Sequence, residues 1–114
     1  WNQGMRELLD ITPPNDREGC LQDIHWYDGA WGYFPTYTLG AMTAAQIFRA
    51  ATDADPEIAA GIPQGNFKPL MSWLRDNIHA KGSLMPASQL LTEATGHPLD
   101  PEIFKQHLQQ RYLP

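Results

Sequence analysis

The chain has 114 residues, a hydrophobic fraction of 42% and a formal net charge of −5 at pH 7. This length predicts one domain over residues 1–114, large enough to bury a core, and we expect neither a signal peptide nor a membrane-spanning helix. The eight Lys and Arg residues are scattered along the chain, which argues against nucleic-acid binding because such surfaces need clustered positive charge.

Cys20 is the only cysteine in the chain. A single cysteine cannot form an internal disulfide, and a lack of disulfides is typical of proteins from reducing compartments. We therefore expect a cytoplasmic protein, in which Cys20 is a small buried hydrophobic side chain rather than a nucleophile.

The first part of the chain predicts a short helix over residues 1–10, where apolar residues recur at helical spacing before two prolines end the pattern. Asn15, followed three residues later by Glu18, resembles a capping box that opens a helical turn. The sequence starts at Trp1 without an initiator Met, so we expect it to have been cut from a longer protein.

The middle of the chain combines an irregular segment with a long helix. Residues 19–37 show neither a strand nor a helix period, so they predict an ordered but irregular segment. A helix is expected over 35–52, with proline at its first position and an apolar side that faces a core. Residues 53–65 contain two prolines and two glycines and predict a loop with one helical turn at 56–60.

Three more helices are predicted in the rest of the chain from their start and stop signals. They are 67–78 with Asn66 as its cap, 86–96 between Pro86 and Gly96, and a last helix from Asp100 to Tyr112. No stretch alternates long enough to predict a strand, so the sequence indicates an all-α fold with one irregular segment.

The irregular segment, GCLQDIHWYDGAWGYFPTY, concentrates polar and aromatic side chains. A helix that starts at Pro35 would direct its free N–H groups and partial positive charge toward this segment. The hydroxyls of Tyr33 and Tyr37 and the imidazole of His25, oriented by Asp23, suit the binding of a carboxylate or of a developing oxyanion. The residues themselves thus predict an anion or oxyanion pocket.

Gly19-Cys20-Leu21-Gln22-Asp23-Ile24-His25-Trp26 resembles the Gly-x-x-Gln-Asp-x-His-Trp signature of the carboxypeptidase Taq family of zinc carboxypeptidases. This eight-residue pattern is specific, and the resemblance extends over essentially the whole chain. Its other blocks are Trp1-Asn2, Pro14-Asn15-Asp16, Gly32-Tyr33-Phe34-Pro35-Thr36-Tyr37, Trp73-Leu74, Ile78-His79 with Gly82, Ala94-Thr95-Gly96, and Phe104 with Tyr112.

The resemblance implies a mostly helical metallopeptidase fold, a homodimer, and removal of single residues from peptide C-termini. It also implies zinc, held by a His-Glu-x-x-His helix and a downstream Glu, in which the two His share one helix face. This sequence has no such helix, because its four histidines, His25, His79, His97 and His107, include no pair at i, i+4 spacing. We therefore expect no metal ligand in this chain, an upstream metal-binding domain, and no activity of the 114 residues alone.

The resemblance makes His25 the expected donor of a hydrogen bond to the carbonyl oxygen in the transition state, with Tyr33 or Tyr37 sharing or replacing that role. The structural alternatives are a hydrogen-bonded core imidazole for His25 and packing with tethered hydroxyls for the two tyrosines. Supporting or substrate-binding roles are expected for Gln22, Asp23 and Trp26.

Two functions remain open at this point. The first is the C-terminal helical subdomain of a zinc metallocarboxypeptidase that binds the C-terminus of a peptide. The second is a non-catalytic helical module that binds a peptide or carboxylate through the same pocket. In either case the apolar stripe over residues 67–78 is core, or a surface that another domain covers, and we expect the isolated chain to self-associate.

Overall fold

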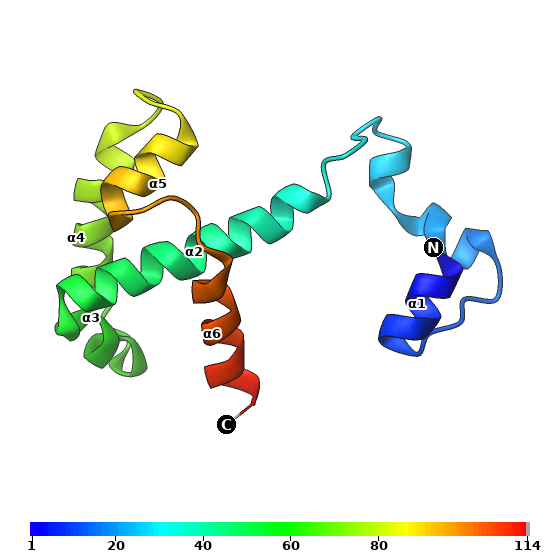
Figure 1. Ribbon diagram of the computed structural model, residues 1–114, viewed down its shortest axis with the longest axis horizontal. Helices are drawn as coiled ribbons and strands as arrows, with labels where there is room; N and C mark the ends of the chain where they lie inside the picture. Colours follow the sequence, from blue (N-terminus) through cyan, green and yellow to red (C-terminus); the bar gives the residue numbers. More distant parts are fainter. Residues whose placement is uncertain (114) are drawn as a thin grey trace. The chain divides into compact units, whose positions relative to one another are not determined.

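The computed structural model describes residues 1–113, and within them it contains helices and turns but no β-strand (Figure 1). This confirms the all-α prediction. The α-helices are α1 (Asn2–Leu9), α2 (Pro35–Ala54), α3 (Pro56–Gly61), α4 (Lys68–Asn77), α5 (Ala87–Thr95) and α6 (Pro101–Tyr112). Short 3₁₀ turns are η1 (Asp16–Glu18), η2 (Cys20–Gln22), η3 (Ile24–Trp26), η4 (Ile62–Gln64) and η5 (His79–Lys81).

The chain divides into two compact units, Trp1–Tyr37 and the part from Thr38 onward. Each unit is described by itself below. One domain over residues 1–114 stays a prediction. Within residues 1–113 no helix combines the length and the apolar character that crossing a membrane requires.

The first unit is built from α1 and the turns η1 to η3. Asn15 caps η1 as predicted, because its side chain accepts the Glu18 N–H at 2.9 Å, while the Glu18 carboxylate accepts from the Asn15 side-chain amide at 3.0 Å rather than from the backbone N–H of a full capping box. Gly19, which is buried, follows directly. A Cβ at Gly19 would lie 3.1 Å from both the Asn15 carbonyl oxygen and the Trp1 ring, so this close approach favours glycine.

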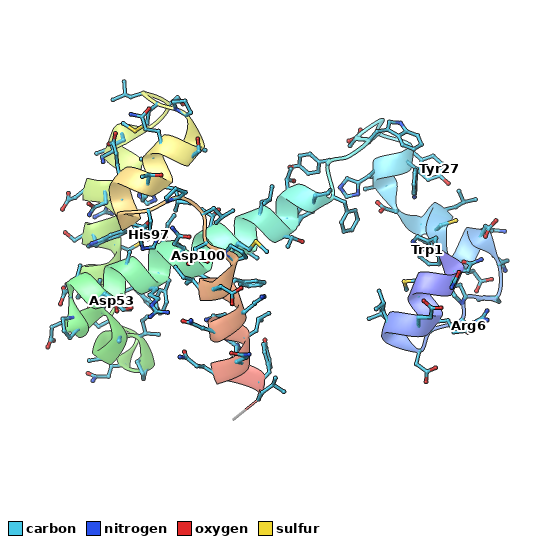
Figure 2. The ribbon with its side chains drawn as sticks, in the orientation of Figure 1. Trp1, Arg6, Tyr27, Asp53, His97 and Asp100 are labelled. Atoms are coloured by element: carbon cyan, nitrogen blue, oxygen red, sulfur yellow. The ribbon has the colours of Figure 1, made fainter. Side chains whose placement is uncertain are left out.

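The second unit is organised around Gln46 of α2, which is 1% exposed. Its side-chain nitrogen lies 2.9 Å from Thr95 Oγ1 and 3.0 Å from the Pro98 carbonyl oxygen, and its oxygen accepts the Asp100 N–H at 2.8 Å. Figure 2 shows Asp100 and His97 where the chain passes α2 between α5 and α6. The Gln46 side chain therefore connects α2 to the segment between α5 and α6 through hydrogen bonds.

The apolar core of the second unit is small. Among the described residues, the buried apolar side chains are Ala51, Ile58 and Leu91. Leu39 and Phe48, on the apolar side of α2 that was expected to face a core, are 49% and 38% exposed. An amphipathic pattern identifies which face of a helix is apolar, but it does not determine whether that face is covered.

The helix starts follow the sequence signals with one shift. Asp100 caps α6 as predicted, because its carboxylate accepts the Glu102 N–H at 2.9 Å. At α4 the predicted cap, Asn66, lies one residue too early: Phe67 occupies the cap position, while the Asn66 side chain still accepts the Lys68 N–H at 3.3 Å. Pro69 in the first turn of α4 still suits a helix start, because the N–H that proline lacks would have no partner within the helix there.

Candidate functional site

The residues of the signature segment are positioned by 3₁₀ turns rather than by a regular helix. Asp23 lies between η2 and η3 in an extended conformation, and its carboxylate accepts the His25 N–H at 3.0 Å. This contact caps η3. The aspartate therefore fixes the backbone of His25 before its side chain contributes anything further.

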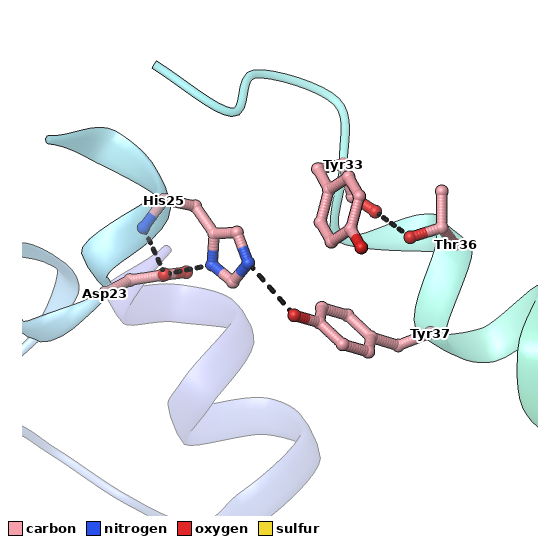
Figure 3. A network of polar contacts seen from close by, with 5 residues as sticks. All are labelled: Asp23, His25, Tyr33, Thr36 and Tyr37. Carbon is pink, nitrogen blue, oxygen red and sulfur yellow. Dashed lines mark hydrogen bonds and ion pairs between the residues drawn. The ribbon is translucent and has the colours of Figure 1, made fainter. Parts of the chain in front are cut away.

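The same carboxylate also holds the His25 ring. His25 Nδ1 lies 2.5 Å from Asp23 Oδ1, and His25 Nε2 lies 3.3 Å from the Tyr37 hydroxyl. Figure 3 shows the three side chains in a row, with the imidazole between carboxylate and phenol. Asp23, which the sequence analysis expected to orient His25, contacts one ring nitrogen, and of the two tyrosines left open for the site Tyr37 contacts the other ring nitrogen.

The contacts of His25 with Asp23 and Tyr37 indicate which ring nitrogen of His25 carries a proton. An ionised carboxylate only accepts hydrogen bonds, so Nδ1 of His25 carries the proton that points to Asp23. In the neutral ring Nε2 then accepts from the Tyr37 hydroxyl, whereas in the protonated ring Nε2 donates. His25 is partly exposed, with 21% of its side chain accessible, so a ligand can reach part of the imidazole.

The two contacts from His25 lower the pKa of Asp23 from its ordinary value of 3.8. The largest cause is the hydrogen bond from the His25 backbone N–H, followed by the hydrogen bond to its ring. Both contacts favour the charged carboxylate. Asp23 therefore stays ionised at neutral pH and keeps the imidazole in one orientation.

Aromatic rings enclose the imidazole on its other sides. Tyr33 stacks on His25 with ring centres 5.8 Å apart and an angle of 25° between the planes. Phe34 lies closer, at 5.1 Å. Sequence analysis did not single out Phe34. The signal available was its position directly before the helix-starting Pro35, which favours an extended backbone at residue 34 and so keeps Phe34 outside the helix.

The start of α2 contributes less than the sequence predicted. The N–H of Thr36 donates to the Tyr33 carbonyl at 2.9 Å, and the N–H of Tyr37 donates to the Phe34 carbonyl at 3.2 Å. Proline has no N–H at all, so the first donors of the helix are absent or already used. The expectation that these N–H groups face the segment as free donors is wrong, and the polar groups of the site are side chains.

Gln22 and Trp26 lie in the same segment but contact other groups. The Gln22 amide donates to the Arg17 carbonyl at 2.5 Å, which ties η2 back to η1. Trp26 packs edge-to-face on Trp31, with ring centres 4.9 Å apart. Gln22 thus supports the backbone of the signature, and Trp26 forms a separate aromatic pair beside His25.

The His, Cys, Asp and Glu side chains that the structure describes do not form a set that fits a metal ion. Within the described part, residues 1–113, no three His, Cys, Asp or Glu side chains gather closely enough to hold one. Zinc needs three or four such ligands, and the imidazole nitrogen of His25 that faces Asp23 is already hydrogen-bonded. The site is a set of positioning and hydrogen-bonding groups.

Comparison with curated proteins finds several carboxypeptidases. The chain is 41% identical to Thermostable carboxypeptidase 1 of Pyrococcus furiosus over 113 residues and 38% identical to Carboxypeptidase 1 of Bacillus subtilis over 112 residues. These matches cover 99% and 98% of this chain but 23% and 22% of the relatives. The chain therefore spans less than a quarter of the length of the relatives that it matches.

Solved structures give the same result. Trypanosoma cruzi Metallocarboxypeptidase 1 matches with a TM-score of 0.92 and 39% identity, over 100% of this chain and 24% of its own. A carboxypeptidase from Deinococcus radiodurans matches with a TM-score of 0.91 and 34% identity, over 98% and 23%. A family model described as carboxypeptidase Taq (M32) metallopeptidase matches residues 1–112. With nearly every residue matched, the chain belongs to the carboxypeptidase Taq (M32) family of metallopeptidases.

Proposed function

We propose that this chain forms part of the catalytic cleft of a zinc metallocarboxypeptidase that removes single residues from the C-termini of peptides. The observation that carries the proposal is the row of Asp23, His25 and Tyr37 within the family signature. Such a row supports the proposal because it holds the His25 ring in one orientation at a partly exposed position. The reaction adds one water molecule across the last peptide bond and releases one amino acid.

His25 has the central role in this proposal. With Nδ1 held by the Asp23 contact, the protonated imidazole ring donates from Nε2 to the carbonyl oxygen of the scissile bond as negative charge develops there. The Tyr37 hydroxyl, 3.3 Å from Nε2, either shares that oxygen or keeps Nε2 occupied until the peptide arrives. Tyr33 stacks on the ring and restrains it, while Gln22 and Trp26 support the backbone and the wall of the cleft.

The metal belongs to another part of the enzyme in this proposal. When bound, zinc supplies a Lewis acid and an activated water molecule. We expect the zinc ligands in an enzyme as long as the relatives, within the part that these 114 residues do not span. A single domain over residues 1–114, a homodimer and a cytoplasmic location complete the proposal, and the last follows from the single cysteine, Cys20.

The test is kinetic and uses the complete product of the gene that carries this sequence. We expect His25→Ala to lower kcat about 10²–10³-fold with a small change in KM, the typical effect of losing one oxyanion donor. Tyr37→Phe should cause a smaller loss. His79→Ala, a histidine of η5 outside the first unit, serves as the control and should retain wild-type rates.

The outcome also decides between the two open functions. If the complete gene product releases C-terminal residues and His25→Ala slows that release by about 10²–10³-fold, the catalytic proposal stands. A product that binds peptides but releases no residue would contradict it and favour the non-catalytic module. Equal losses in His25→Ala and His79→Ala would also contradict it, since they would indicate a general effect on folding.

A further inference from the structure

A small apolar pocket lies next to His25 in the first unit. Its volume is about 140 Å³, and its walls are the rings of Trp26, Trp31 and Phe34 together with Asp23 and His25. All five residues come from one short stretch of chain, so the pocket is built locally. Trp31 is 73% exposed and Trp26 is 43% exposed, which is costly for two large rings unless something covers them.

The volume and lining select the kind of occupant. A protein cavity of about 150 Å³ lined by apolar side chains binds benzene, so this pocket has room for one aliphatic or phenyl side chain. Aromatic walls favour an apolar group, and Oδ1 of Asp23, a residue of the lining, is already engaged by both N–H groups of His25. One apolar side chain therefore fits the pocket better than a charged one.

The pocket shares His25 with the polar row, and this fixes which side chain can enter. In the proposed function, Nε2 of His25 contacts the carbonyl oxygen of the scissile bond. That carbonyl belongs to the residue before the C-terminal one, and its side chain starts only two bonds from the carbonyl carbon. The side chain of this penultimate residue therefore reaches the pocket most directly.

We infer that Trp26, Trp31 and Phe34 form a specificity subsite for an apolar side chain at the penultimate position of the peptide, an inference that rests on the proposed function of His25. Peptides with Leu or Phe at this position gain contact with the rings. Peptides with Gly leave the pocket empty. The subsite thus sets a preference one residue away from the residue that is released.

The experiment measures kcat/KM of the complete gene product for acetyl-X-Ala peptides, with X as Gly, Leu, Phe or Lys, and for acetyl-Ala-X peptides. We expect the wild type to prefer Phe over Gly at the penultimate position. Trp31→Ala should reduce this ratio at least about tenfold, the effect expected for an apolar contact in a pocket. Ala30 also lines the pocket, so Ala30→Leu should narrow it. This variant should lower kcat/KM more for the peptide with penultimate Phe than for the peptide with penultimate Gly.

Ile24→Ala is the matched control. Ile24 is an exposed apolar residue of η3, the turn that contains His25 and Trp26, and it does not line the pocket. Its ratio should equal that of the wild type. If the Phe-to-Gly ratio of kcat/KM stayed unchanged in both Trp31→Ala and Ala30→Leu, the proposed subsite would be wrong. It would also be wrong if these variants changed kcat/KM only for the acetyl-Ala-X peptides or only for the peptide with penultimate Lys. A wild-type protein that hydrolyses none of the peptides would instead refute the proposed function.

Discussion

His25 is held by its backbone and by its side chain, and both contacts lead to Asp23. One carboxylate oxygen accepts the His25 N–H at 3.0 Å and also contacts Nδ1. The side chain of Asp23 is partly exposed, at 30%. The orientation of the imidazole thus depends on the ionisation of a carboxyl group that water can reach.

This dependence predicts a response to acid. The pKa of Asp23 is lowered from 3.8 in the folded chain, so ionised Asp23 stabilises the fold at pH above the unfolded-state pKa. That contribution is lost as the pH falls through the lower, folded-state pKa. In an NMR titration that follows the Asp23 carboxyl carbon, we expect a midpoint below 3.8.

A variant separates the two causes of this shift. His25→Ala removes the ring contact but keeps the backbone N–H, which is the larger cause. The pKa of Asp23 should therefore rise in this variant and still stay below its ordinary value. A wild-type midpoint at or above 3.8 would refute the geometry described for the Asp23 carboxylate.

The residue scale also shows what the sequence could predict. The signature from Gly19 to Trp26 identified His25 and its partner Asp23, because their spacing in the chain is short enough for a local contact. Gln46 was not identified, although it is among the most buried side chains. Its partners lie about fifty residues away in the α5–α6 connection, and no local pattern reveals such a contact.

At the scale of elements, the start signals were the most informative part of the sequence. The caps at Asn15 and Asp100 form as predicted because each contact closes within three residues. The prediction of free N–H groups at the start of α2 was wrong because their partners lie in the preceding turn. Its N–H groups bond to the carbonyls of Tyr33 and Phe34, and the path of that turn depends on packing around His25 rather than on the residues at the helix start.

The second element-scale feature is the attachment of the α5–α6 connection to α2, which predicts a loss of stability in Gln46→Met. Methionine preserves the length of the side chain but cannot bond to Thr95 Oγ1, the Pro98 carbonyl or the Asp100 N–H. Part of the α5–α6 connection is open to water, so water can satisfy some of the groups that lose Gln46 as a partner. We therefore expect the free energy of unfolding to fall by about 2 kcal/mol. Urea unfolding followed by circular dichroism measures the change.

The control for this prediction is Gln109→Met, a change of the same chemistry at an exposed position of α6. It should alter the free energy of unfolding by less than about 0.5 kcal/mol. If Gln46→Met proved as mild as the control, the hydrogen bonds of Gln46 would contribute little, and apolar packing alone would hold the connection.

At the scale of the whole molecule, the proportion of covered apolar surface is low. The first unit, Trp1–Tyr37, has no buried apolar side chain, and its one buried residue is Gly19. The second unit buries three, Ala51, Ile58 and Leu91. The sequence predicted core residues by periodicity, but the surface that covers them lies outside these 114 residues in the proposed enzyme, so periodicity could not predict their exposure.

The exposed start of α4 predicts how the isolated 114-residue chain behaves in solution. Phe67 is 53% exposed and Met71 is 37% exposed, and both line one groove with Lys68 and Arg75. Adjacent exposed apolar side chains favour association in water. We expect the sedimentation coefficient of the isolated chain to rise with concentration, and Phe67→Glu should weaken this rise.

Leu84→Glu is the control for this change, because Leu84 is 83% exposed and lies outside that groove. Scattered exposed leucines do not by themselves cause association, so this variant should associate as the wild type does. The complete gene product should show no such effect of Phe67→Glu on association if another part of the enzyme covers the groove. Equal weakening by Phe67→Glu and Leu84→Glu would indicate that added negative charge, and not the groove at α4, controls the association.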